Sequence, residues 1–259
     1  MSPPSGRGTP RRAASAERQE IPTMLPLSMP RRAGGSMLLW LAATVIGAGL
    51  PGAAAQAQPM LYEQRLPEGF AFLRLANALP GAVTVKPDFG PAVSLGAEGA
   101  TRISAYLIGE GVADRPVTLG VTEGNTTTEL VVRVTAGGSN TVLLQRQGAA
   151  PVATVVRDST EYNQTRARLT FYNAIPGCAD GVLAVEPSGP TVFSAVPADA
   201  MRSRSINPVR AKVRAGCAGR SSPSLDLGQL EAGGQYSVWL MAPAGEPVSF
   251  LARDTIAPR

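Results

Sequence analysis

The sequence has 259 residues, of which 24 are basic and 19 are acidic, and it contains no histidine. The missing imidazole excludes Ser-His-Asp and Cys-His nucleophile pairs and removes the commonest metal ligand. The net charge of +5 and the isoelectric point near 9.7 would favour a polyanionic partner only if the basic residues belonged to the mature protein.

The chain begins with the pattern of a secretory signal peptide. Arg31 and Arg32 precede an apolar run over Met37–Ile46, and small residues follow as far as Ala57. The apolar run is shorter than the roughly 20 residues needed to cross a bilayer. We therefore expect residues 1–57 to be an N-terminal extension with a signal peptide, cleaved near Ala57 during export to the periplasm.

Most of the net charge lies in these same 57 residues. Six arginines against two glutamates give +4 of the total +5, so the mature chain is nearly neutral and gives no indication of a nucleic-acid partner. The composition of residues 1–29, rich in Pro, Ser and Arg, predicts disorder or untranslated sequence, and the start is left open between Met1, Met24 and Met29. The charged residues are Arg7, Arg11, Arg12, Arg18, Arg31, Arg32, Glu17 and Glu20.

The remaining 200 or so residues contain an internal duplication at a constant offset of 96. In one block of 23 positions, Ala136–Asp158, nine residues recur in 232–254, whereas unrelated sequence of average composition would share about one or two. The period has the size of a domain rather than of a solenoid repeat. A second block repeats Ala71, Leu73, Asn77, Ala78, Pro80 and Gly81 as Ala167, Leu169, Asn173, Ala174, Pro176 and Gly177.

Each copy opens with a strand that ends in Asn-Ala-(Leu/Ile)-Pro-Gly. Apolar and polar residues alternate over Ala71–Asn77 and over Arg166–Tyr172, which predicts a sheet with one face in water. The Pro-Gly pair predicts a turn. Further strands are expected at Val83–Lys86, Val93–Leu95, Thr101–Ile108, Val117–Thr122, Thr127–Val134, Thr141–Gln147 and Val152–Arg157, and in the second copy at Val209–Arg214, Tyr236–Met241 and Val248–Arg253.

Seven or eight short strands per copy, separated by Gly and Pro, are typical of a β-sandwich. We therefore expect an all-β protein with two tandem immunoglobulin-like or jelly-roll-type β-sandwich domains after the signal peptide. The first domain is predicted over residues 58–160 and the second over residues 165–259, with the boundary in the polar stretch Ser159–Gln164.

Both cysteines, Cys178 and Cys217, lie in the second copy. In an oxidising periplasm an even pair favours a disulfide over a reactive thiol or metal pair, and no histidine is present to assist either alternative. The acidic residues are scattered singly, without a calcium-loop or phosphate-loop pattern. We expect no catalytic site, no metal and no cofactor.

One local basic feature stands out in the nearly neutral mature chain. Alternation places Arg210, Lys212 and Arg214 on one face of a strand, and Arg202 and Arg204 precede them with the same spacing. One interpretation is a solvated face or a charged edge strand that prevents edge-to-edge pairing. The other is a carboxylate-binding strip, because same-face side chains lie about 7 Å apart and arginine can bind a carboxylate bidentately.

The mature sequence resembles the alginate O-acetylation protein AlgF family. The opening Leu61-Tyr62-Glu63, the Pro67-Glu68-Gly69 triplet and the strand ending in Asn77-Ala78 are similar to the start of that family, and Ile206-Asn207-Pro208-Val209 is similar to its Ile-Asn-Pro-Val motif. The resemblance covers most of 61–259. The cysteine pair and a longer first copy around Gly109–Gly124 depart from the family pattern.

The resemblance implies a periplasmic accessory protein for O-acetylation of an exopolysaccharide such as alginate. In that family the acyl transfer belongs to a membrane-bound O-acetyltransferase and to periplasmic acetyltransferases, so this chain would bind or bridge those partners, the anionic polysaccharide, or both. No catalytic residue carries over. The expected interaction surface comprises Arg202, Arg204, Asn207, Arg210, Lys212 and Arg214. The alternative is an exported structural or adhesive β-sandwich module without a role in acetylation.

Overall fold

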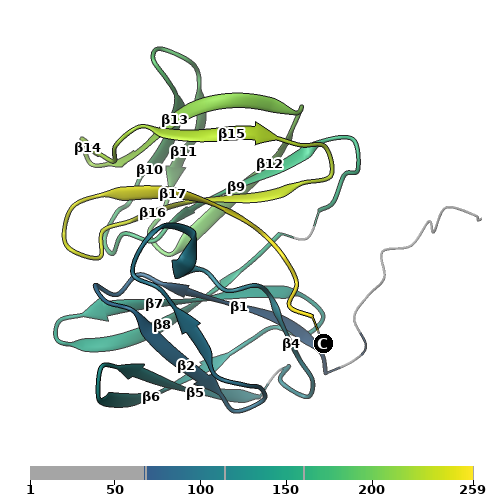
Figure 1. Cartoon of the computed structure of the whole chain (residues 1–259), viewed down its shortest axis with the longest axis vertical. Coiled ribbons are helices and arrows are strands. Elements are labelled where there is room, and N and C mark those ends of the chain that lie inside the picture. Colours follow the sequence, from purple (N-terminus) through teal and green to yellow (C-terminus); the bar gives the residue numbers. More distant parts are fainter. Residues whose placement is uncertain (1–66, 68, 114, 160, 259) are drawn as a thin grey trace, which may run out of the picture. The chain divides into compact units, whose positions relative to one another are not determined.

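A computed structural model describes residues 67, 69–113, 115–159 and 161–258 (Figure 1). The predicted signal peptide with its cleavage near Ala57 and the Leu61-Tyr62-Glu63 opening lie outside the described residues. The described part of the chain is all-β, as expected, and its one helical element is a 3-10 turn at Gly99–Arg102. Among these residues, no helix has the length and apolar character needed to span a membrane.

Strands β1–β8, which we call the first half, form two four-stranded sheets. The sheet β4-β1-β7-β8 consists of Leu107–Gly109, Ala71–Asn77, Ser139–Gln147 and Ala150–Arg157, in that order. The sheet β3-β2-β5-β6 consists of Val93–Leu95, Val83–Pro87, Pro116–Glu123 and Thr126–Arg133.

Strands β9–β17, the second half, form two further sheets. The sheet β12-β9-β16-β17 consists of Ala200–Ile206, Ala167–Asn173, Gln235–Met241 and Val248–Arg253. In the other sheet β11-β10-β13-β14 run in order and β15 also pairs with β13; these strands are Thr191–Val196, Gly181–Val185, Val209–Cys217, Arg220–Ser221 and Leu225–Leu230.

The 96-residue offset recurs in the strand register. In the first half β1 pairs in parallel with β7, with Phe72 opposite Ser139. In the second half β9 pairs in parallel with β16, with Arg168 opposite Gln235, and both residues stand 96 positions later. The antiparallel pairs β7–β8 and β16–β17 keep the same relation. The position of the boundary between the two copies stays a prediction.

Both sheets of each half contribute side chains to a common hydrophobic cluster. In the first half Leu73 and Leu75 from β1 share a cluster with Val85 and Leu119 from the other sheet. The second half has its own cluster, which joins residues of β9 and β16 to residues of β10 and β13. Alternation along β1 and β9 supplies the inward residues.

The expectation of one face in water is wrong for β1, where only Phe72 is partly exposed, and for β9, where all seven residues are buried. The second face of β9 contributes Tyr172 to a third cluster, which also contains Trp239 from β16 and Ala76 and Leu143 from the first half. The rings of Tyr172 and Trp239 stack with centroids 4.0 Å apart. The face predicted to be wet therefore packs against the other half of the chain.

The strand expected at Thr101–Ile108 also forms differently. Its first residues belong to the 3-10 turn and only its end belongs to β4. The side chain of Arg102 is buried and donates from Nη1 to the carbonyl oxygens of Asn77 and Leu79, at 2.8 and 2.9 Å. The segment therefore forms a turn that ends at Arg102, and the guanidinium of this residue is buried against the two carbonyl oxygens.

The Asn-Ala-x-Pro-Gly motif has a structural role in both halves. Asn77 donates from Nδ2 to the carbonyls of Gly81 and Gly96, each at 2.8 Å, and its Oδ1 accepts the backbone N–H of Leu79 at 2.9 Å. The buried amide of Asn77 thus connects the turn after β1 to the segment at Gly96 by hydrogen bonds. Because buried amide groups need partners, this arrangement explains why both copies contain asparagine here.

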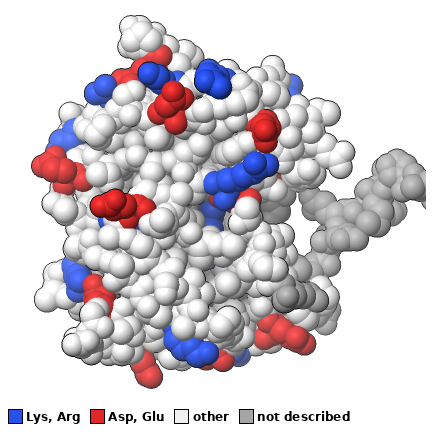
Figure 2. All heavy atoms as spheres, in the orientation of Figure 1, with Lys and Arg blue, Asp and Glu red and all other residues white. Residues whose placement is uncertain are grey.

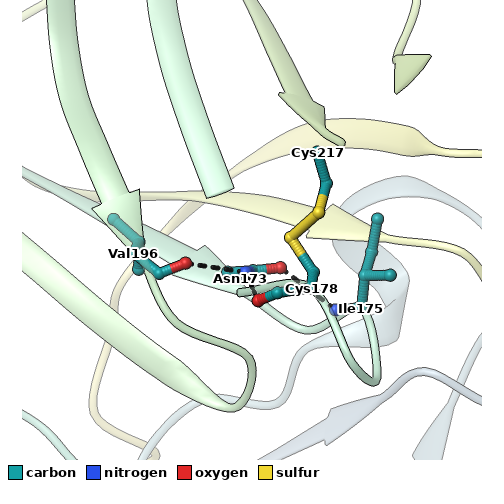
Figure 3. Close-up of a disulfide and its surroundings, with 5 residues drawn as sticks. All are labelled: Asn173, Ile175, Cys178, Val196 and Cys217. Carbon is teal, nitrogen blue, oxygen red and sulfur yellow. Dashed lines mark hydrogen bonds between the residues drawn. A yellow bond between two sulfur atoms is a disulfide. The ribbon is translucent and has the colours of Figure 1, made fainter. Parts of the chain in front are cut away.

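Asn173 makes the equivalent bonds in the second half (Figure 3). Its Nδ2 donates to the carbonyls of Cys178 and Val196 at 3.0 and 2.8 Å, and its Oδ1 accepts the backbone N–H of Ile175 at 3.3 Å. The two halves therefore close this turn with the same side chain and three contacts of the same kind, although the two carbonyl partners are not at equivalent positions.

The predicted disulfide between Cys178 and Cys217 is confirmed, with a Cα–Cα distance of 6.0 Å (Figure 3). It joins the connection between β9 and β10 to the end of β13. Both cysteines belong to the hydrophobic cluster of that half. The positions 96 residues earlier, Ala82 and Val121, contain no sulfur.

Candidate basic cleft

The predicted basic residues lie on two strands of different sheets. Arg202 and Arg204 belong to β12, which pairs with β9. Arg210, Lys212 and Arg214 belong to β13, which pairs with β10 and β15. The short connection that contains Asn207 joins the two strands, so the strip expected from sequence spacing is divided between the sheets.

The alternation predicted for β13 is present in the structure. Val213 and Ala215 are buried, whereas Arg210, Lys212 and Arg214 are exposed. The register shift between β13 and β15 puts its extra residue on β15, where Gly228 has a φ of 61°. That left-handed conformation suits glycine, and β13 itself stays regular.

Arg204 lies on an edge strand and reaches across to the other sheet. It is opposite Leu169 in the β12–β9 register, so its side chain leaves the strand on the same side as that core residue. Its Nη1 donates to the carbonyl oxygen of Val192 in β11 at 3.2 Å. The guanidinium thus lies between β12 and β11, which are edge strands of the two sheets of the second half.

A cleft of about 680 Å³ opens at this place, and we call it the basic cleft. Buried apolar side chains, among them Leu169, Val213 and Leu230, form its floor. Val209, which is 41 % exposed, also lines it. The basic residues of its lining are Arg204, Arg210 and Lys212. Its volume falls within the range of small-molecule sites.

The cleft combines an apolar interior with positive charge. Within the described residues, none of its three cations forms an ion pair, and the acidic residue of the lining, Glu186, is bonded elsewhere. Glu186 accepts a hydrogen bond from Arg214 Nε at 2.5 Å. Hydrogen bonds from Ser224 and then from Arg214 lower the pKa of this carboxyl, so it stays ionised.

The structure brings together four of the six predicted site residues. Arg204, Asn207, Arg210 and Lys212 line the basic cleft. Arg214 pairs with Glu186 and lines a smaller pocket near the disulfide, and Arg202 does not line the cleft. On the face of the molecule drawn in Figure 2, charged side chains of both signs are interspersed.

The one group of described residues with metal-ligand geometry is Cys178, Asp180 and Cys217. Their ligand atoms lie within 4.8 Å of one another. Both sulfur atoms are joined in the disulfide, however, so the group presents a single carboxylate and no thiolate. This arrangement agrees with the disulfide interpretation of the cysteine pair.

A buried charge cluster around Arg74 was missed by sequence reasoning. Arg74 is 1 % exposed, and its guanidinium donates to Asp254 Oδ1 at 2.5 Å, to the Tyr172 hydroxyl at 2.7 Å and to Thr141 Oγ1 at 3.1 Å. It also lies 4.5 Å from the centroid of the Tyr106 ring. The cluster therefore joins groups from both halves.

The Arg74 cluster is electrostatically stable in its charged form. Burial alone lowers the pKa of Arg74. The charge interactions with Tyr172, Asp254, Tyr106 and Asp158 raise it by more than burial lowers it, so the net shift is upward. Burial raises the pKa of Tyr106 and of Tyr172. The sequence signal that could have identified this cluster is the repeated Arg-Asp pair that ends each copy.

Comparison with known proteins gives no family assignment: no protein-family model and no curated protein sequence matches the chain. Function must therefore be argued from the residues of the chain itself.

Proposed function

We propose that this protein is a non-catalytic periplasmic accessory protein for O-acetylation of an exopolysaccharide such as alginate, and that it binds an anionic partner through the basic cleft. The observation that carries the proposal is an apolar floor next to three cations that form no ion pair with any described residue, in and beside the segment that resembles the Ile-Asn-Pro-Val motif. The cleft belongs to the second half alone.

An acetylated acidic polysaccharide presents the two chemical groups that such a cleft can hold. Its carboxylates can accept hydrogen bonds from Arg204 and Arg210, which bind anions bidentately, and a point charge is available from Lys212. Its acetyl methyl groups can contact apolar side chains such as Val209. An acidic loop of a partner protein would use the same cations.

We assign the acetyl transfer itself to partners, a membrane-bound O-acetyltransferase and periplasmic acetyltransferases. The cleft offers cations and apolar surface but no nucleophile with an adjacent base, and the chain has no histidine to serve as one. The disulfide supports placement in an oxidising compartment outside the cytoplasm.

We further propose that each half is one immunoglobulin-like or jelly-roll-type β-sandwich domain. Support comes from the two sheets of each half, which contribute side chains to one hydrophobic cluster. In such a domain the basic cleft would lie at the open edge between the sheets.

Retention on an immobilised polyuronate at low salt tests binding by the cleft. The double charge reversal Arg210→Glu with Lys212→Glu is expected to abolish retention, because the exposed cations would then repel carboxylates. Arg157→Glu, a change at an exposed residue of β8 in the first half, is the matched control and should leave most retention in place. Equal retention of both variants would contradict the proposal.

A further inference from the structure

A second cavity, of about 480 Å³, lies where the two halves meet, and we call it the junction pocket. It shares no lining residue with the basic cleft, so what it binds is independent of the proposed function. Its walls come from the first residues of β7 and β16, from β1 and β9, and from the segments after β8 and β17.

Three pairs of residues in this pocket are equivalent at the 96-residue offset. The duplication has therefore brought corresponding positions of the two copies together around one cavity. Each pair has diverged, so the walls differ: one copy supplies an aromatic ring where the other supplies a guanidinium. The pairs are Phe72 and Arg168, Ser139 and Gln235, and Ser159 and Thr255.

Arg168 is a buried cation whose Nε–H has no hydrogen-bond partner. It is 8 % exposed, and its two terminal nitrogens donate to the carbonyl oxygens of Ser159 and Glu161. Its Nε is the only buried side-chain nitrogen or oxygen of the described residues without a hydrogen-bond partner. Within those residues Arg168 also forms no ion pair. A buried donor without an acceptor requires an explanation.

Asp254 offers the complementary group in the same pocket. Its Oδ1 accepts hydrogen bonds from Arg74 and from Ser237, at 2.5 and 2.7 Å. Its Oδ2 accepts none from the described residues, although the side chain is 11 % exposed. The pocket is therefore lined by an unused acceptor and by a cation that forms no ion pair within the described residues.

Two aromatic rings form the apolar part of the wall. Phe72 and Tyr106 meet edge to face, with ring centroids 6.5 Å apart. Tyr106 is fixed by its hydroxyl, which donates to Asp158 at 2.8 Å, and by the guanidinium of Arg74. Fixed rings can pack against the C–H face of a sugar at little cost in conformational entropy.

We propose that the junction pocket binds a hydroxylated carboxylate of monosaccharide size, that is, a sugar acid. The ligand carboxylate pairs with the guanidinium of Arg168, a ligand hydroxyl donates to Asp254 Oδ2, and the C–H face of the ring packs against Phe72. A phosphate dianion fits less well because the Asp254 carboxylate repels it. A neutral sugar fits less well because it leaves Arg168 without a counter-ion.

Isothermal titration of the full mature chain with D-glucuronate, compared with D-glucose, tests this proposal. We expect glucuronate to bind with an affinity at least about tenfold higher than that of glucose, because a charge-assisted hydrogen bond distinguishes the two ligands. No binding of glucuronate, or equal binding of both sugars, would overturn the proposal.

Two variants locate the binding. Arg168→Met removes the donor, and Ser139→Leu fills the pocket without removing a charge; each should lower glucuronate affinity about tenfold or more. If Arg168→Met does not fold, Ser139→Leu still decides the matter. Arg115→Met, which changes an exposed residue outside the lining of both the junction pocket and the basic cleft, is the control and should bind glucuronate as the wild-type protein does. Binding that persists in Ser139→Leu would place the ligand elsewhere and overturn the proposal.

Discussion

The two halves of the chain use the same strand register but differ in what they add to it. Thr141 donates to Asp158 in the first half, and Ser237, 96 residues later, donates to Asp254 in the second. Among the described residues, the disulfide and the basic cleft both belong to the second half. Only the first half supplies the buried Arg74, where the second has Thr170. Duplication kept the hydrogen bonds that fix the sheets and left other positions free to diverge.

The largest expected effect is at Arg74, which joins the two halves. Arg74→Met should lower the free energy of unfolding by about 3–5 kcal/mol, because it leaves the Asp254 carboxylate without its ionic partner at the junction. Denaturant titration of the purified protein measures the change. Arg115→Met, which breaks the exposed ion pair with Asp88, is the control and should cost much less.

A second outcome at the same site separates charge from packing. Adding Asp254→Asn to Arg74→Met removes the uncompensated carboxylate, so the double variant should recover part of the lost stability. If Arg74→Met were no more destabilising than Arg115→Met, the joining role of Arg74 would be wrong.

The next effect concerns the disulfide, which distinguishes the second half from the first. The double substitution Cys178→Ala with Cys217→Val gives the second half the residues that the first has at the equivalent positions, Ala82 and Val121. We expect a loss of about 3–4 kcal/mol, because opening a loop of about 40 residues restores entropy to the unfolded chain.

Reduction of the wild-type protein provides the control for the disulfide. Intact mass after alkylation should show two protected cysteines before reduction and two modified cysteines afterwards. Alkylation of either cysteine in the native, unreduced protein would contradict the disulfide.

A smaller effect is expected at the two asparagines, and here the halves should agree. Asn77→Ala and Asn173→Ala each remove three hydrogen bonds from one turn, so each should cost about 1–3 kcal/mol. Thermal unfolding of the two variants gives the comparison. Asn163→Ala, which changes an exposed side chain, is the control. A large loss in one variant and none in the other would show that the motif serves only one half.

Sequence patterns predicted well those strands in which apolar residues alternate. Ala71–Asn77 and Val248–Arg253 form strands with the predicted bounds. The strand Ala200–Ile206 was not predicted, because Arg202 and Arg204 occupy positions where a buried strand would have apolar residues. It forms nonetheless as an edge strand that pairs along its length with β9, and long-range pairing of this kind leaves little local signal.

The candidate site was partly predictable for the same reason. Alternation identified the face of β13 that carries Arg210 and Lys212, since that depends on one strand only. It did not reveal that Arg204 approaches from another sheet, or that an apolar cleft lies between them. Arg74 was missed for a related reason. Alternation along β1 places its side chain on the face away from the core of the first half, but alternation alone does not show whether that face contacts water or the second half.

The most direct test of the proposed function is the acetyl content of the exopolysaccharide in cells. The native gene is replaced by the Arg210→Glu, Lys212→Glu variant, with the Arg157→Glu variant as the control, and immunoblots confirm equal amounts of each protein. The account predicts that the cleft variant, like a deletion of the gene, lacks polymer acetyl groups while the control retains them. Normal acetylation in the deletion strain would contradict the account and favour an exported structural or adhesive module.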